Sequence, residues 1–227
     1  MKKILKIVSI LLSFVCLVSV LSSCSAGKYN TKNTGKGASV SMTAVKKEID
    51  SKKAEDFEET DKKTDYVKFK IKDYGEIVVV LREDIAPITV KNFKKLVKDG
   101  FYDGLIFHRV VENFMIQGGG FDENFKQKEA DAIKGEFSSN SVTNNLTHVR
   151  GVISMARTRV KDSASSQFFI MHKDTASLNG EYAAFGYVLA GMDVVDAIAT
   201  CEVSGSADSP VPVKNVVIES AVFVVPK

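Results

Sequence analysis

One arginine, Arg109, stands in a run of large apolar side chains at residues 105–119. Phe114 and Met115 follow it in this run, and the neutral amide of Gln117 comes next. No acid–base pair, nucleophile or metal-type cluster accompanies them in the sequence. A permanent cation with a fixed fork of donors, set beside apolar side chains, suits a reaction in which a bond is rotated rather than broken.

Other kinds of chemistry find little support in the sequence. His108, His148 and His172 lack the spacing of metal ligands. The glycines at 118–120 are not followed by Gly-Lys-Ser/Thr, so they do not form a phosphate loop, and no serine lies in a Gly-x-Ser-x-Gly turn. These observations predict neither a cofactor nor a metal. The alternative for Arg109 is an arginine that reaches the surface or pairs with an acid.

The elements around Arg109 decide what it can reach. Residues 105–111 are typical of a β-strand, and strict alternation places Phe107 and Arg109 on the same face. On the return strand, Met115 and Gln117 share a face. We therefore expect Arg109 and Gln117 to converge over one apolar surface.

The rest of the body alternates short β-rich runs with turn residues. A helix is predicted from Pro87 to the residue before Gly100, and a second one over residues 192–199. Without strand–helix alternation, the pattern predicts a mainly β fold, a closed antiparallel eight-stranded barrel capped by two α-helices. The predicted strands are residues 66–72, 76–81, 105–111, 114–117, 152–155, 168–171, 184–188 and 216–225.

The N-terminus is typical of a secretory signal. Lysines at its start precede an uncharged apolar run over residues 7–20, which is short for a membrane-spanning helix. The following Leu-Ser-Ser-Cys resembles a bacterial lipobox and implies cleavage before Cys24, with a lipid such as palmitate on that cysteine. We therefore expect residues 1–23 to be a lipoprotein signal peptide. An ordinary signal or an N-terminal anchor is the alternative.

The remaining chain divides by composition. Residues 24–64 are rich in charged and small polar side chains, and predict a lipid-anchored flexible tether, with a charged helix near residues 42–57 as an alternative for part of it. Residues 65–227 have the length of one domain with a well-covered core. The net charge of +3 is small, and much of the lysine excess precedes the body, so the charge does not indicate nucleic-acid binding.

Three blocks of the body together resemble the cyclophilin family of peptidyl-prolyl cis/trans isomerases. They are Phe-His-Arg-x-x-x-x-Phe-Met-x-Gln-Gly-Gly at 107–119, Ser-Met-Ala at 154–156 and Ser-Gln-Phe-Phe-Ile at 166–170, in the order of the family. The resemblance covers residues 65–227. It implies catalysis of rotation about X-Pro bonds, an enzyme of the class peptidyl-prolyl cis-trans isomerase, without a cofactor.

The resemblance also assigns residues. It implies that Arg109 is the catalytic donor and that Gln117 orients it. Arg157 and Tyr182 stand where well-known eukaryotic members carry asparagine and histidine, and Ser177 stands in place of a tryptophan, so we expect weak binding of cyclosporin. The substrate-binding residues implied are Phe114, Met115, Ala156, Arg157, Gln167, Phe169, Leu178 and Tyr182.

The expected function is therefore an isomerase that helps exported proteins to fold at the outer face of the bacterial cell membrane. Its partners would be proline-containing unfolded or extended polypeptides and, through the lipid, the membrane; we expect a monomer. The alternative is a non-catalytic chaperone that holds proline-containing segments in the same groove. A structural lipoprotein has less support, and the motifs of parvulin-type isomerases are absent.

Overall fold

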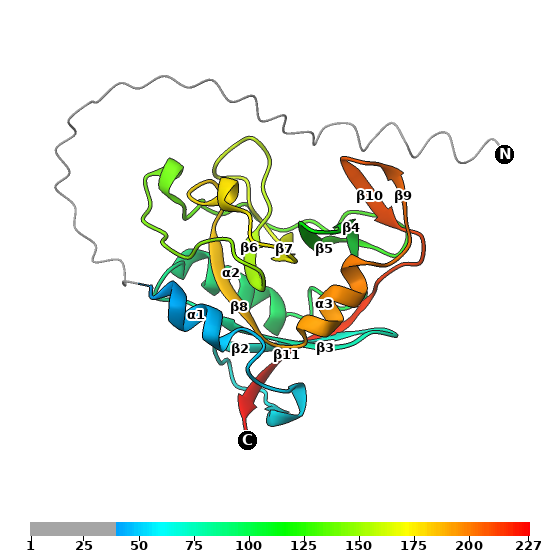
Figure 1. The fold of residues 1–227 in the computed structure, drawn as a ribbon, viewed down its shortest axis with the longest axis horizontal. Coiled ribbons are helices and arrows are strands. Elements are labelled where there is room, and N and C mark those ends of the chain that lie inside the picture. Colours follow the sequence, from blue (N-terminus) through cyan, green and yellow to red (C-terminus); the bar gives the residue numbers. More distant parts are fainter. Residues whose placement is uncertain (1–39) are drawn as a thin grey trace. The chain divides into compact units, whose positions relative to one another are not determined.

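The computed structural model of the chain describes residues 40–227, so the signal segment and Cys24 lie outside the described residues (Figure 1). The described part contains the helices α1 (Met42–Glu48), α2 (Pro87–Lys98) and α3 (Met192–Ala199). Short 3₁₀ turns are η2 (Ala54–Asp56), η3 (Ser138–Asn140) and η4 (Ala176–Leu178). The strands are β1 (Phe57–Glu59), β2 (Tyr66–Ile71), β3 (Gly75–Leu81), β4 (Leu105–Val111), β5 (Met115–Asp122), β6 (Val152–Met155), β7 (Phe168–Met171), β8 (Ala184–Ala190), β9 (Val203–Ser206), β10 (Ser209–Pro212) and β11 (Ile218–Pro226).

Nine strands form one antiparallel sheet in the order β1-β11-β2-β3-β8-β6-β7-β5-β4. A bridge between Ile106 and Val217 connects β4 to the segment before β11, and Phe107 donates a backbone hydrogen bond of 2.9 Å to Val216. The mainly β prediction is confirmed. The described part has three helices rather than two, and its continuous strand ladder ends at β1 and β4, so the closed barrel of eight strands is not confirmed.

The strands β9 and β10 form a separate two-stranded hairpin. Figure 1 shows this hairpin apart from the main sheet, at the end of the domain where β4 and β5 lie. The strand β10 contacts β4, the strand that carries Arg109. The hairpin therefore borders the region in which the sequence predicts the site.

The main core lies between the sheet and α2. Phe93 of α2 packs with ring centroids 5.0 Å from Phe185 and 5.8 Å from Phe168. Removing such a buried ring costs about 3–5 kcal/mol of folding free energy. The predicted helix has one apolar stripe, and all of it is buried: Val90, Phe93, Leu96 and Val97.

Two helices are capped by carboxylates that lie far away in the sequence. The first turn of α2 is held by buried Glu136, whose oxygens accept the backbone N–H groups of Ile88 at 3.1 Å and Thr89 at 2.7 Å. The N-cap residue of α3 is Gly191, which has no side chain, and Asp50 supplies the missing acceptor. Free N–H groups at a helix start need such partners. These hydrogen bonds therefore fix the segments that carry Glu136 and Asp50 to the two helices.

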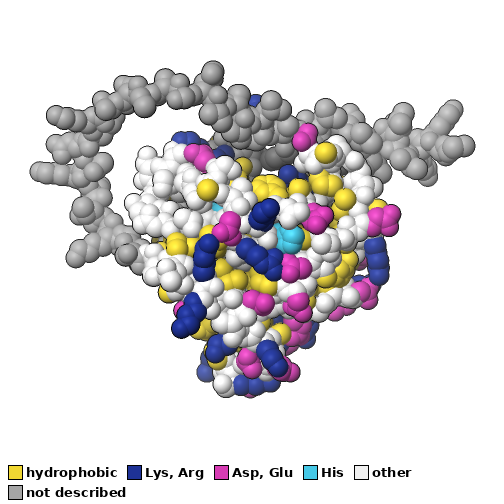
Figure 2. Space-filling view, viewed as in Figure 1, with side chains coloured by type: hydrophobic (Ala, Val, Ile, Leu, Met, Phe, Trp, Pro, Cys, Tyr) yellow, Lys and Arg dark blue, Asp and Glu magenta, His cyan; other side chains and the backbone are white. Residues whose placement is uncertain are grey.

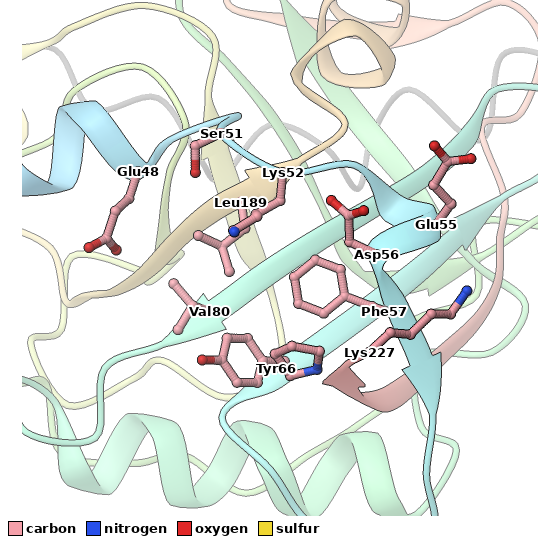
Figure 3. Close-up of a pocket in the computed structure, with 11 residues that line it drawn as sticks. Glu48, Ser51, Lys52, Glu55, Asp56, Phe57, Tyr66, Val80, Leu189 and Lys227 are labelled. Carbon is pink, nitrogen blue, oxygen red and sulfur yellow. The ribbon is translucent and has the colours of Figure 1, made fainter.

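Residues 40–59 are structured and belong to the same compact unit as the body, although composition predicts a flexible tether up to residue 64. Helix α1 buries Val45, and β1 pairs with β11. The rings of Phe57 and Tyr66 lie 5.8 Å apart and line a pocket between this segment and the sheet (Figure 3). The segment folds because these few apolar side chains find partners on the sheet. No helix in the described residues is long and apolar enough to cross a membrane.

Candidate active site

A β-bulge at His108 sets the direction of Arg109. Phe107 and Arg109 pair with neighbouring residues of β5, so the register shifts between them. Phe107 packs in the core, 5.8 Å from the ring of Phe168, whereas Arg109 contacts side chains on the outer face. The prediction that Phe107 and Arg109 share a face is therefore wrong, because the extra residue of a bulge interrupts the alternation of side chains.

The guanidinium of Arg109 is held from three sides. Its Nη1 donates to Gln117 Oε1 at 3.3 Å and lies 3.7 Å from the sulfur of Met115, and its Nε donates to the carbonyl oxygen of Asp208 at 3.1 Å. Its Cζ lies 5.9 Å from the ring centroid of Phe114. The expected convergence of Arg109 and Gln117 is present. The contact with Asp208, in the turn of the β9–β10 hairpin, has no signal in the sequence.

The electrostatic surroundings of Arg109 follow from its position. Burial lowers the pKa of its guanidinium, while Tyr182 and Asp208 act in the opposite direction. Arginine stays charged in spite of such a shift, because its ordinary pKa lies far above neutral pH. A charge that has lost part of its water in this way interacts more strongly with a polar group brought next to it.

Gln117 is itself fixed by a second amide. Its Nε2 donates to Gln167 Oε1 at 3.0 Å, which directs Gln117 Oε1 toward Arg109. Gln167 reaches this position because Gly120 has no side chain: a Cβ at Gly120 would lie 2.5 Å from Gln167 Cγ. The glycine is therefore required by close packing.

An apolar surface lies beside the guanidinium. Met115 and Phe169 are buried in one cluster, and partly buried side chains pack against them. The rings of Phe169 and Tyr182 meet edge to face with centroids 5.7 Å apart. In Figure 2, hydrophobic side chains lie between the loops on the left and the β9–β10 hairpin on the right. The predicted residues in this cluster are Phe114, Met115, Ala156, Phe169, Leu178 and Tyr182.

A buried histidine lies behind this surface, and the sequence did not indicate it. His148 stacks on Phe169 with centroids 5.9 Å apart and an interplanar angle of 20°. Its Nε2 lies 3.0 Å from Ser154 Oγ and its Nδ1 lies 3.1 Å from Asn179 Oδ1. Burial lowers the pKa of His148 to about 4. The neutral ring thus supports both the strand that carries Phe169 and the loop that carries Asn179.

Two further residues lie at the edge of the site. The side chain of Arg157 packs between the rings of Phe137 and Tyr182. Ser177 is exposed on η4, next to Leu178. Ala156 follows the last residue of β6, and its backbone N–H donates to the carbonyl oxygen of Gln167, just before β7, at 2.9 Å.

The described residues offer one cation set over an apolar surface and two interlocked amides, and among residues 40–227 no group of three or more His, Cys, Asp or Glu side chains is placed to hold a metal ion. Such an arrangement can bind an apolar ring and present a donor to a polar atom next to it. It contains no nucleophile paired with a base beside Arg109. Its chemistry is therefore binding and electrostatic stabilisation.

Comparison with known proteins agrees with this geometry. The model of the family "Cyclophilin type peptidyl-prolyl cis-trans isomerase/CLD" matches residues 66–223. A peptidyl-prolyl cis-trans isomerase of Acinetobacter baylyi is 51% identical over 136 residues, which are 57% of this chain and 70% of that protein. Peptidyl-prolyl cis-trans isomerase B of Escherichia coli is 44% identical over 157 residues, 65% of this chain and 93% of that protein.

Solved structures show the same relationship. A cyclophilin type peptidyl-prolyl cis-trans isomerase of Cryptosporidium parvum, crystallised in the presence of the dipeptide Ala-Pro, has a TM-score of 0.60 and 27% sequence identity. The match covers 70% of this chain and 98% of that one. With the match to the family model and the bacterial relatives, it follows that this chain belongs to the cyclophilin-type peptidyl-prolyl cis-trans isomerase family.

Proposed function

We propose that this protein accelerates cis/trans rotation of X-Pro peptide bonds in exported polypeptides, with Arg109 as the catalytic residue. The observation that carries the proposal is the position of the Arg109 guanidinium, oriented by Gln117 at 3.3 Å beside the apolar cluster that contains Met115 and Phe169. Membership of an isomerase family supports it.

The reaction needs little more than this geometry. Amide resonance sets a rotation barrier of about 18–20 kcal/mol, and uncatalysed X-Pro exchange takes tens to hundreds of seconds. During rotation the prolyl nitrogen loses its resonance and becomes pyramidal. A guanidinium N–H directed at that nitrogen stabilises the twisted amide more than either planar form, which is how differential binding lowers a barrier.

The surrounding residues have separate roles in this proposal. Phe114, Met115, Phe169 and Leu178 receive the proline ring, and Tyr182 closes one side of that pocket. Gln117 and Gln167 keep the guanidinium at a fixed angle. The backbone of Ala156 and Arg157 holds the substrate in an extended form. No proton or electron is transferred, so neither cofactor nor general base takes part.

The experiment that tests the activity compares cis-to-trans exchange of an Ala-Pro peptide with the wild type, Arg109→Ala and Arg109→Lys. We expect acceleration by the wild type, a loss of at least about tenfold in kcat/KM for Arg109→Ala, and poor rescue by lysine, which lacks the planar fork. Absence of acceleration by the wild type would refute the enzyme and favour a chaperone. Full activity of Arg109→Ala would refute the role of Arg109.

We also propose that the protein acts at the outer face of the bacterial membrane, anchored by lipid on Cys24. The lipobox-like Leu-Ser-Ser-Cys and the polar segment that follows support this. Helix α1 and strand β1 lie within residues 42–59, so the proposed tether is shorter than composition alone suggests. Cells that produce Cys24→Ser should release the protein from the membrane fraction and lose incorporation of labelled palmitate. Unchanged labelling would exclude Cys24 as the acceptor.

A further inference from the structure

The side chain of Arg157 is enclosed although it lies at the edge of the site. It is 10% exposed, and its Cζ lies 4.9 Å from the ring centroid of Phe137 and 4.8 Å from that of Tyr182. Its Nε donates to the carbonyl oxygen of Glu181 at 2.9 Å, and its Nη1 donates to that of Thr158 at 2.9 Å. Two aromatic faces and two backbone acceptors thus fix one guanidinium.

This environment suits a brace better than a group that binds substrate. Packing over two aromatic rings and donation to two carbonyl oxygens use the flat, delocalised cation and the several fixed N–H groups of a guanidinium. To reach a substrate carboxylate, Arg157 would have to leave both rings and both acceptors. A carboxylate is already within reach, since Nη2 lies 3.4 Å from Glu181 Oε2.

Tyr182 is the part of this arrangement that meets the apolar pocket. On the side of the pocket, its ring meets Phe169 edge to face with centroids 5.7 Å apart, and His148 at 6.5 Å. Arg157 contacts the same ring at 4.8 Å. The adjacent Glu181 accepts a hydrogen bond of 3.0 Å from Ser139, which fastens the loop to η3. The position of the Tyr182 ring therefore depends on Arg157 as well as on the core.

We propose that the side chain of Arg157 is a positioning group: it holds the Tyr182 ring at the wall of the proline pocket and does not itself contact the substrate, whereas the Arg157 backbone keeps the role proposed above. The proposal rests on the function proposed above. It assigns substrate specificity at this edge of the site to the Tyr182 ring. The substrate meets the phenol ring of Tyr182 and not the charge of Arg157. It follows that substitution of Arg157 should lower kcat/KM equally for acidic and for neutral peptides.

The first test observes Tyr182 directly in the full-length chain with ¹³C-labelled tyrosine rings, whose Tyr182 signals are assigned with Tyr182→Phe. Arg157→Gln should shift or broaden those signals. The matched control is Arg82→Gln, because Arg82 pairs with Asp84 at 2.8 and 2.6 Å, at the end of β3 and outside the pocket. Tyr182 signals that move no more in Arg157→Gln than in the control would overturn the proposal.

The second test measures exchange of Glu-Ala-Pro-Phe and Gln-Ala-Pro-Phe peptides. We expect Arg157→Gln to lower kcat/KM about 3- to 10-fold for both, mainly through KM, as loss of a partly buried cation–π contact would do. Arg157→Lys should rescue little, since its ammonium cannot stack on two rings. A loss confined to the acidic peptide, or full rescue by lysine, would show that the charge binds substrate and would refute the proposal.

A double-mutant comparison separates positioning from a direct contact. If Arg157 acts through Tyr182, Arg157→Gln should change kcat/KM little in a Tyr182→Leu background. Independent contributions of the two residues would instead multiply.

Urea unfolding of each variant accounts for general loss of stability. If Arg157→Gln does not fold, Arg157→Lys replaces it in all comparisons. A wild type without isomerase activity would refute the proposed function, while peptide affinity and the Tyr182 signals would still test Arg157.

Discussion

Gln117 Nε2 donates to Gln167 Oε1 at 3.0 Å, and this bond decides which end of the Gln117 amide faces Arg109. An amide has a donor end and an acceptor end, and only the oxygen can accept from a guanidinium. With Nε2 engaged by Gln167, Oε1 is left for Arg109 Nη1 at 3.3 Å. Gln167 therefore orients the proposed catalytic donor, Arg109, indirectly, through its hydrogen bond with Gln117.

Gln167→Ala should therefore impair catalysis without removing any group that contacts the prolyl nitrogen. We expect kcat/KM for an Ala-Pro peptide to fall about 3- to 10-fold, because loss of one neutral hydrogen bond is worth roughly 1 kcal/mol. Gln167→Glu, whose carboxylate still accepts from Gln117, is the matched control and should retain more activity. Equal losses in the two variants would argue against orientation by this bond.

Gly120→Ala should have a similar effect by displacing Gln167. The added Cβ would lie 2.5 Å from Gln167 Cγ, and Gly120 does not have a positive φ, so the effect is steric. We expect reduced activity and a loss of about 1–3 kcal/mol of stability from overpacking. Activity and urea unfolding should be compared with the double variant Gly120→Ala/Gln167→Ala. In the double variant the steric penalty on stability should disappear; its persistence would contradict the explanation.

Cyclosporin is expected to inhibit weakly. Ser177 is small and exposed where better-known family members carry tryptophan, so an apolar surface and an indole donor are missing. Ser177→Trp should strengthen inhibition in the Ala-Pro exchange assay while basal activity changes little, because Ser177 lies outside the apolar cluster. Nanomolar inhibition of the wild type would refute this expectation.

The sequence predicted the elements and residues that depend on local pattern. The amphipathic α2, the strand pair β4–β5 and the convergence of Arg109 with Gln117 follow from periodicity and spacing. The bulge at His108 was missed because one inserted residue leaves no compositional trace. It reversed the relation between Phe107 and Arg109, which strict alternation had placed together.

Contacts between distant segments account for the other differences. The support of Phe169 by His148 depends on Asn179, which is remote in the chain. Helix α1 and strand β1 lie in a polar segment with few apolar residues, and only the sheet supplies their partners. Such tertiary contacts override local composition, so residues 40–59 read as a tether although they fold.

The free energy of unfolding should decrease as the pH is lowered, because His148 is buried in its neutral form. Burial lowers its pKa to about 4 in the folded state, against an ordinary value near 6.5 in the unfolded chain. Above pH 6.5 both states are neutral and the full stability is present. Between pH 6.5 and 4 the unfolded state binds the proton first, so stability is lost progressively, on the order of 3 kcal/mol at most.

The measurement is urea unfolding of the wild type and His148→Gln at pH 7.5 and 4.5. Carboxylates titrate in both proteins, and burial also lowers the pKa of His108 to about 4, so the difference between the two proteins isolates His148. We expect the wild type to lose more unfolding free energy than the variant over this range. Equal losses would mean that His148 is not held neutral.

Asp50 should stabilise the domain from a segment that lies before the region matched by the family model. Its Oδ1 accepts the backbone N–H groups of Gly191 and Met192, both at 3.1 Å, at the start of α3. Asp50→Ala should cost about 1–2 kcal/mol, as loss of an N-cap does, and Asp50→Asn should cost less because its amide oxygen still accepts. The exposed Asp61→Ala is the control for loss of one negative charge. Urea unfolding compares the three variants. If Asp50→Ala and Asp61→Ala unfold at the same urea concentration, the carboxylate does not cap α3 in solution, and residues 40–59 are held by their other contacts, among them the burial of Val45 and Phe57 and the pairing of β1 with β11.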